Sequence, residues 1–254
     1  MLPPGTIEAF GLFGVRTSAL VLAAPLFGVA LPFSGARTGL IVILSAFAWS
    51  RSGTPLPEAA GPIAFAALAM REVLIGLAMA FVLHGIVLAV RVAGELIGHE
   101  MAFNMATVVD PQGISTPLIT QIYEGLFLIG LFALDGHHLV VRALCDSFAR
   151  APVGVVGVSS GLAAAVLRLF ADMFAAGLTF AAPVMVVMVL VSAMIGLLAR
   201  AVPQINVLEV GFTVRIAVAL VAMLLFAPLL APAMERMYVA LAGGLDAVLT
   251  VVEA

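Results

Sequence analysis

Lysine is absent from this chain of 254 residues, and all eleven of its basic residues are arginine. Charged residues of both signs make up only 10% of the sequence, and the net charge is −3. A nucleic-acid-binding domain needs a concentrated basic face, which this composition does not favour. Cys145 is the single cysteine, so a disulfide within the chain is excluded, and we interpret it as a small packing residue.

The sequence is instead rich in apolar residues, which make up 64% of it, and its mean hydropathy is +1.25. Soluble domains contain about 45–50% apolar residues, because a core of this size has too little volume to hide more. We therefore expect an all-α membrane protein with about six hydrophobic helical segments arranged as hairpins. One domain is expected over residues 1–254.

The hydrophobic runs have helical length and are separated by short polar or Pro/Gly-rich breaks. They cover roughly residues 7–31, 38–49, 63–90, 117–141, 162–199 and 207–231. Residues 142–160 are expected to form a loop, and Pro183 to kink or divide its helix. An amphipathic tail follows at 235–249, and the first run is expected to be a retained helix because Glu8, not a basic residue, precedes it.

Four arginines lie inside the hydrophobic runs, namely Arg16, Arg71, Arg168 and Arg215. An unpaired arginine at the centre of a bilayer costs roughly 3 kcal/mol on insertion scales. The arginines between the runs are divided almost evenly between the two sides, so the positive-inside rule gives no orientation. These helices are therefore expected to contact protein as well as lipid, although snorkelling of the arginines to water is the alternative.

Some of these charges have neighbours at helical spacing. Arg168 and Asp172 are four residues apart, as are Arg91 and Glu95, so each pair can share a helix face. Arg71 and Glu72 are adjacent, and we expect them to face different partners.

The most polar interruption of the hydrophobic pattern runs from residue 91 to residue 121. Within it, the sequence Asp110-Pro111-Gln112-Gly113 is typical of a tight turn. The apolar stretch that leads into this turn contains Met101, Phe103 and Met105, with Val108 and Val109 directly before it. Flexible methionines beside a rigid turn favour a loop buried in a cavity or pore over a simple surface connection.

Enzyme motifs are incomplete. His99-Glu100 begins a zinc-protease pattern, but Phe103 stands where the second histidine is required. Asp135, His137 and His138 look metal-like, yet adjacent histidines on a helix point about 100° apart and rarely bind one ion. We expect neither a catalytic site nor a metal site or other cofactor, and His84 is expected to be packed or bonded to a partner.

Three separated blocks resemble the FliR family, which includes the SctT-type proteins of virulence secretion systems. They are GELIGHEMAFNMATVVDPQGISTPLITQ, LFALDGHHLVVRAL with SFARAPVG, and ARAVPQINVLEVGFTVRI, in the family's order and spacing. The resemblance implies a non-enzymatic subunit of the type III protein export gate, in the bacterial inner membrane at the flagellar basal body. The DGHH and PQ.N forms favour a flagellar over a virulence system.

The resemblance also implies partners. The expected ones are FliP-like and FliQ-like subunits in a spiral pore assembly, FlhB-like and FlhA-like export components, unfolded export substrates and membrane lipid, with no nucleic acid. It assigns the segment from Phe103 to Gln121 as the plug of the closed pore. The residues expected to serve assembly, from the resemblance or from their buried charge, are Arg16, Arg71, Glu72, Glu95, Asp135, His137, Arg168, Asp172, Arg200, Pro203, Gln204 and Asn206.

A small-solute secondary transporter is the alternative function. Transporters usually contain internal repeats with broken helices in corresponding positions. Pro183 could mark one break, but no matching half is visible in the sequence.

Overall fold

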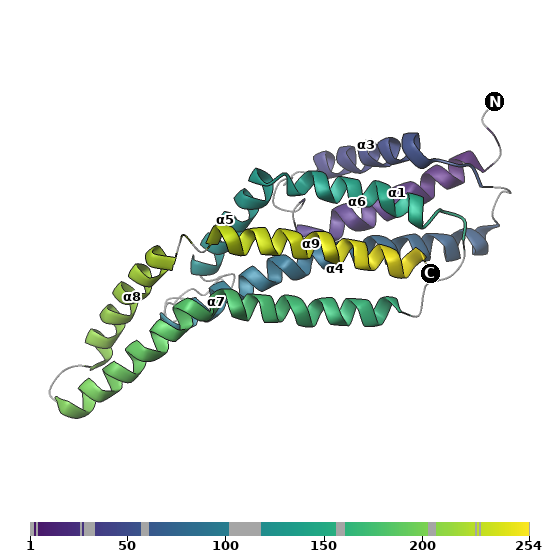
Figure 1. The fold of residues 1–254 in the computed structure, drawn as a ribbon. Helices are drawn as coiled ribbons and strands as arrows, with labels where there is room; N and C mark the ends of the chain where they lie inside the picture. The colour runs from purple at the N-terminus through teal and green to yellow at the C-terminus, as the bar shows by residue number, and fades with distance from the viewer. Residues whose placement is uncertain are drawn as a thin grey trace. The chain divides into compact units, whose positions relative to one another are not determined.

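A computed structural model of the chain describes residues 3, 5–25, 27, 34–56, 61–101, 118–155, 161–202, 207–226, 228 and 230–253. These residues are almost all helical, and no strand occurs among them (Figure 1). The helices are α1 (Thr6–Ala23), α3 (Ser34–Ser52), α4 (Pro62–Glu100), α5 (Leu118–Ala133), α6 (Gly136–Arg150), α7 (Leu162–Ala201), α8 (Val207–Phe226) and α9 (Leu230–Glu253).

Four of these helices are long and apolar enough to cross a membrane, namely α1, α4, α7 and α8. The bent pair of α5 and α6 gives a fifth candidate span when the two are taken together. The expectation of an all-α membrane protein is therefore confirmed. The helices α4 and α7 contain 39 and 40 residues, about twice the 20 or so that a bilayer core requires.

The predicted boundaries differ from the observed ones in the middle of the chain. The run 117–141 is divided between α5 and α6, and the expected loop 142–160 is wrong, because α6 continues to Arg150. Its apolar residues lie on one face, where Val140, Leu144 and Phe148 are buried at a spacing of four. Pro183 lies inside α7 without ending it.

The chain divides into two compact units, each described here by itself. Unit 1 comprises residues 1–86, 132–171 and 238–254, and unit 2 comprises residues 87–131 and 172–237. The division follows packing and leaves the single functional domain expected over 1–254 a prediction.

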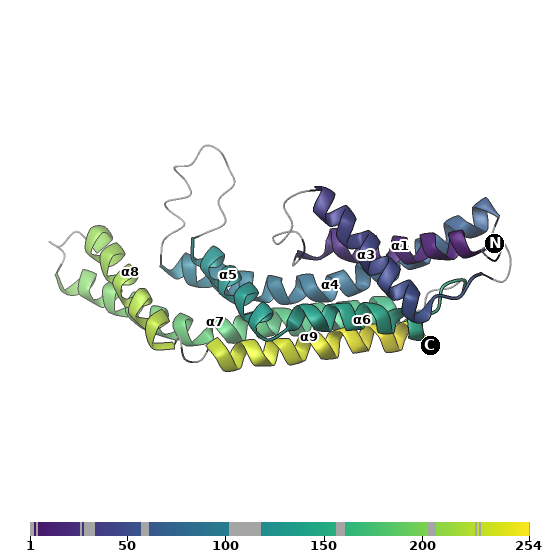
Figure 2. The same cartoon turned by 90° about the horizontal axis from the view of Figure 1, so that it is seen from above.

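In unit 1, α3 packs against both α1 and α6, as both ribbon views show (Figures 1 and 2). Aromatic rings fill the space between these helices. The rings of Phe13 and Phe148 stack with centroids 3.9 Å apart, and the ring of Trp49 meets that of Phe13 edge-on at 5.2 Å. These contacts join three helices that are distant in the sequence and form the apolar surroundings of the charged cluster described below.

The C-terminal part of unit 1 is the amphipathic end of α9. Its buried residues Leu241, Leu245 and Val248 recur every three or four positions, which places them on one helix face. Arg150 of α6 pairs with Asp246 on the exposed side, with 2.7 Å between Nη1 and Oδ1. The predicted amphipathic tail is therefore confirmed.

Unit 2 contains helices in close contact and a hairpin, formed by the end of α7 and by α8, whose surface is mostly exposed. A Cβ atom on Gly177 of α7 would lie 2.5 Å from the carbonyl oxygen of Ala89 on α4, so these helices approach at backbone distance. The end of α7 and α8 run side by side in both views (Figures 1 and 2), and Gly211 of α8 faces Ile195 of α7.

Candidate functional site

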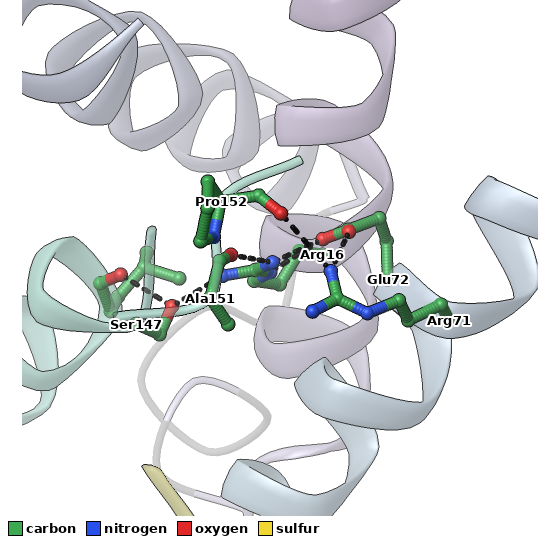
Figure 3. Close-up of polar contacts among 7 residues, drawn as sticks. Arg16, Arg71, Glu72, Ser147, Ala151 and Pro152 are labelled. Carbon is green, nitrogen blue, oxygen red and sulfur yellow. Dashed lines mark hydrogen bonds and ion pairs between the residues drawn. The ribbon is translucent and has the colours of Figure 1, made fainter. Parts of the chain in front are cut away.

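A buried cluster of charges joins α1, α4 and the end of α6 within unit 1 (Figure 3). Arg16 is fully buried at its centre, although the rest of the buried face of α1 is almost entirely apolar. Its Nε donates a hydrogen bond of 2.6 Å to Oε2 of Glu72, and its Nη1 donates one of 3.1 Å to Oγ of Ser147. Its guanidinium also lies 4.2 Å from the ring centre of Phe148.

The C-terminal end of α6 supplies further acceptors. Nη2 of Arg16 donates to the carbonyl oxygen of Ala151 at 2.8 Å, and Nη1 of Arg71 donates to that of Pro152 at 3.1 Å. Both carbonyl groups belong to the two residues that directly follow α6, so neither has a partner in the hydrogen-bond pattern of that helix. Two arginines facing a single buried carboxylate are therefore partly balanced by these carbonyls.

Arg71 and Glu72 contact each other, with 3.2 Å between Nη1 of Arg71 and Oε1 of Glu72. The expectation that these adjacent residues face different partners is wrong, because the long arginine side chain bends back to its neighbour's carboxylate. Arg16 and Glu72 are 0% exposed and Arg71 is 6% exposed. Their charges are satisfied within the chain, and a role for them in assembly stays a prediction.

The helices that carry this cluster touch at backbone distance. A Cβ atom on Gly76 of α4 would lie 2.5 Å from the carbonyl oxygen of Arg16 and 2.7 Å from Cβ of Ala19. Only glycine fits there, so α1 and α4 are held close enough for the ion pair to form.

A second group of contacting residues, in unit 2, lies on the two helices on either side of residues 102–117. Arg91 near the end of α4 pairs through Nε with Oε1 of Glu124 on α5. About one helical turn closer to residues 102–117 on each helix, a Cβ atom on Gly94 would lie 2.6 Å from Cα of Thr120. We call these four residues the stem, because they fasten together the two helices that precede and follow residues 102–117.

The ion pair of the stem differs from the expected one. Glu95 is exposed, and Arg91 pairs with Glu124, 33 residues away, rather than with Glu95. Met101, the first expected plug residue, is fully buried at the end of α4. The other expected plug residues lie outside the described part of the chain, namely Phe103, Met105, Val108, Val109, Asp110, Pro111, Gln112 and Gly113.

A third cluster lies at the turn between α5 and α6, in unit 1. One ligand atom from each of Asp135, His137 and His138 falls within 4.8 Å of the others. The sequence pattern predicted that the two adjacent histidines would point apart, but their ring centres are only 4.1 Å apart. The two rings therefore lie against each other at the start of α6, and the expectation that they do not bind one ion stays untested.

The remaining expected assembly residues are at the surface or outside the described residues. Arg168, Asp172 and Arg200 are exposed on α7, and the described contacts include no ion pair between Arg168 and Asp172. Pro203, Gln204 and Asn206 lie outside the described residues. His84 is exposed on α4, so of its two expected roles packing within the chain is not observed, and bonding to a partner stays a prediction.

The hairpin of α7 and α8 presents a broad apolar surface. Only 22% of the apolar window of α7 and 17% of that of α8 are buried, against 61% for α4. Large side chains on it are strongly exposed, among them Val189, Leu190, Leu197, Leu224 and Leu225. A surface of this kind requires lipid or a protein partner to cover it.

The sequence pattern did not identify three residues of these sites, namely Thr120, Glu124 and Ser147. Glu124 carried a usable signal, because it is a lone charge in the apolar run of α5. Thr120 and Ser147 carried none, since small hydroxyl residues are common in packed membrane helices.

Comparisons with known proteins place the chain among export proteins. A sequence profile of bacterial export proteins, family 1, matches residues 7–241. The chain is 32% identical to the flagellar biosynthetic protein FliR of Bacillus subtilis over 84% of this chain and 83% of that protein. It is 30% identical to the protein of the same name from Escherichia coli over 88% and 86%, and 29% identical to that of Pectobacterium carotovorum over the same shares.

Proposed function

This chain belongs to the bacterial export proteins, family 1, and we propose on that premise that it is a non-enzymatic subunit of the export gate of a flagellar type III secretion apparatus. The main support for this proposal is the extent of the family match. The matched residues, 7–241, run from α1 into α9 and include segments of both units. Several apolar helices of spanning length agree with a place in the bacterial inner membrane.

The proposed partners are FliP-like and FliQ-like subunits that form a pore with this chain, beside FlhB-like and FlhA-like export components. The bare surface of α7 and α8 supports this part of the proposal, because its exposed valine and leucine side chains suit packing against other apolar helices. Unfolded export substrates are the cargo, and this chain supplies surface rather than chemistry.

The segment from Phe103 to Gln121 is proposed to close the pore at rest. The stem supports this role, because Gly94 against Thr120 and Arg91 against Glu124 give the segment a fixed base. A plug of this design yields without disturbing the helices that carry it, since its two ends stay fastened together.

The proposal is tested by deleting the gene in the source bacterium and measuring flagellin and hook protein in the medium. We expect both to disappear from the medium and to return when the intact gene is supplied on a plasmid. A plasmid that carries the gene with an early stop codon is the matched control. Unchanged secretion by the deletion strain would contradict the proposed function.

A further inference from the structure

Three side chains with metal-binding chemistry meet at the turn that joins α5 to α6. Asp135 offers a carboxylate oxygen, and His137 and His138 each offer a ring nitrogen, all within 4.8 Å of one another. These three residues belong to none of the other sites described above, namely the buried charge cluster, the stem and the apolar hairpin.

The backbone of the turn brings the three residues together. Asp135 adopts a left-handed conformation with φ of 57°, and its carbonyl oxygen accepts a hydrogen bond of 3.0 Å from the N–H of His138. The next residue, Gly136, begins α6. The carboxylate therefore folds back over the first helical turn, where both imidazole rings lie.

The side chain of Asp135 does not cap α6, although aspartate is among the preferred residues at this position. Its Oδ1 instead lies 3.1 Å from Nδ1 of His138, and both side chains are well exposed, at 73% and 63%. A ligand from solution can therefore reach both groups.

His137 supplies a second and independent observation. Its Nδ1 is buried and has no hydrogen-bond partner in the described part of the chain. Its ring lies 5.4 Å from that of Phe132 and 4.1 Å from that of His138. A buried ring nitrogen without a partner is unfavourable unless another group satisfies it.

The distances suit a small divalent ion. Zinc binds imidazole nitrogen and carboxylate oxygen at about 2.0–2.2 Å, which puts neighbouring ligand atoms of a tetrahedral site about 3.3–3.6 Å apart. The oxygen of Asp135 and the nitrogen of His138 lie 3.1 Å apart, slightly closer than that separation. Binding of the ion therefore requires the remaining ligand atom to approach by about 1–1.5 Å.

The geometry points to a binding site for one divalent transition-metal ion, with Asp135, His137 and His138 as its three protein ligands and water in the remaining positions. Two imidazoles and one carboxylate favour Zn²⁺, Ni²⁺ or Cu²⁺, whereas Mg²⁺ and Ca²⁺ prefer oxygen ligands. The ion fixes the turn between α5 and α6, because its ligands come from both the turn and the first turn of α6. This inference does not rest on the proposed role in export.

The test uses the full-length chain in detergent, purified through a tag without histidine, stripped with a chelator and titrated with Co²⁺ and then Zn²⁺. We expect one Co²⁺ per chain, visible by its d–d absorption and displaced by Zn²⁺. In known metal sites, loss of a hydrogen bond that supports a ligand weakens metal binding by roughly 10–100-fold. Asp135→Asn and His138→Gln each remove a ligand itself, so each should weaken binding by more than that.

The matched control is His84→Gln, which removes an exposed histidine of α4 outside this turn. It should leave affinity and stoichiometry unchanged. His138→Cys replaces one metal ligand by another, so this variant should still bind Co²⁺ and should add a thiolate-to-Co²⁺ charge-transfer band. The band distinguishes loss of a ligand from loss of the fold. Three results would overturn the site. They are a His137→Gln/His138→Gln double variant that binds Co²⁺ as tightly as the unchanged protein, a His84→Gln variant that weakens binding as much as His138→Gln does, and absence of the charge-transfer band in His138→Cys.

Discussion

Nε of Arg16 donates a hydrogen bond of 2.6 Å to Oε2 of Glu72, and neither side chain has any surface exposed to solvent. The two residues lie 56 positions apart, on α1 and α4. Their pairing explains how an arginine can occupy an apolar helix, because each charge balances the other in surroundings where neither reaches water. Ser147 and the end of α6 complete the site.

Removal of one member of this pair should destabilise the protein far more than removal of both. Glu72→Leu leaves Arg16 buried beside Arg71 without an anion, and we expect it to lower the free energy of unfolding by about 3–5 kcal/mol. Arg16→Met combined with Glu72→Leu should retain more stability than Glu72→Leu alone, because the fully buried Arg16 charge is removed and Arg71 keeps its hydrogen bond to the carbonyl oxygen of Pro152. Thermal unfolding in detergent, followed by circular dichroism, measures both.

Arg150→Ala is the control for that comparison. It removes a pair of the same type with Asp246, but those side chains are 35% and 61% exposed. Water screens exposed pairs, so the expected change is about 1 kcal/mol or less. A Glu72→Leu variant no less stable than Arg150→Ala would contradict the importance of the buried pair.

Gly94→Ala should push α4 and α5 apart at the stem. The added Cβ would lie 2.6 Å from Cα of Thr120, which is backbone and cannot rotate away. Overpacking of this kind costs about 1–3 kcal/mol, and in the assembled gate we expect ion leakage as well. Thermal unfolding and ion flux in vesicles provide the two measurements.

Gly125→Ala serves as the partner experiment on α5, because a Cβ atom there has no heavy atom within 4 Å. It should leave leakage unchanged and raise stability by about 0.5–1 kcal/mol, since alanine favours a helix over glycine. If Gly94→Ala behaves like Gly125→Ala, the stem is not a close contact in the working protein.

Deletion of residues 108–114 should leave assembly intact and make the gate leak ions or small molecules. The deletion removes the turn Asp110-Pro111-Gln112-Gly113 but none of the stem residues. Complex yield and dye permeability of cells that express the variant separate the two effects. Loss of assembly without leakage would show that the segment is structural rather than a plug.

A charge on the bare hairpin should affect association rather than folding of the chain. Leu224 of α8 is 75% exposed, so Leu224→Glu leaves the packing of the chain itself intact while it places a carboxylate where lipid or a partner helix is expected. We expect normal thermal unfolding in detergent and a lower yield of complex. Leu241→Glu provides the contrast, because Leu241 is 1% exposed and the chain should unfold more readily.

Much of the fold was predictable from hydrophobic pattern alone. The apolar runs located α1, α4, α7 and α8, because a bilayer selects long uninterrupted helices. The pattern missed the second half of α6, which contains the charged residues Arg142, Asp146 and Arg150. Their spacing of four was itself a helical signal, and it places them on the face opposite Leu144 and Phe148.

The partners within the sites were less predictable. Pattern reasoning pairs charges at helical spacing, which suggested Glu95 for Arg91, whereas the observed partner is Glu124 on another helix. Glu72 was recognised as unusual, but its pairing with Arg16 depends on Gly76, which lets two backbones touch. Contacts of this kind follow from packing between helices that are distant in the sequence.

The most direct test of the export-gate account is a native mass spectrum of the chain co-expressed with its candidate FliP-like and FliQ-like partners. The account predicts a single complex that contains this chain of 26.1 kDa once, together with several copies of each partner. Recovery of the chain alone, or only with copies of itself, while the partners assemble without it, would contradict the account.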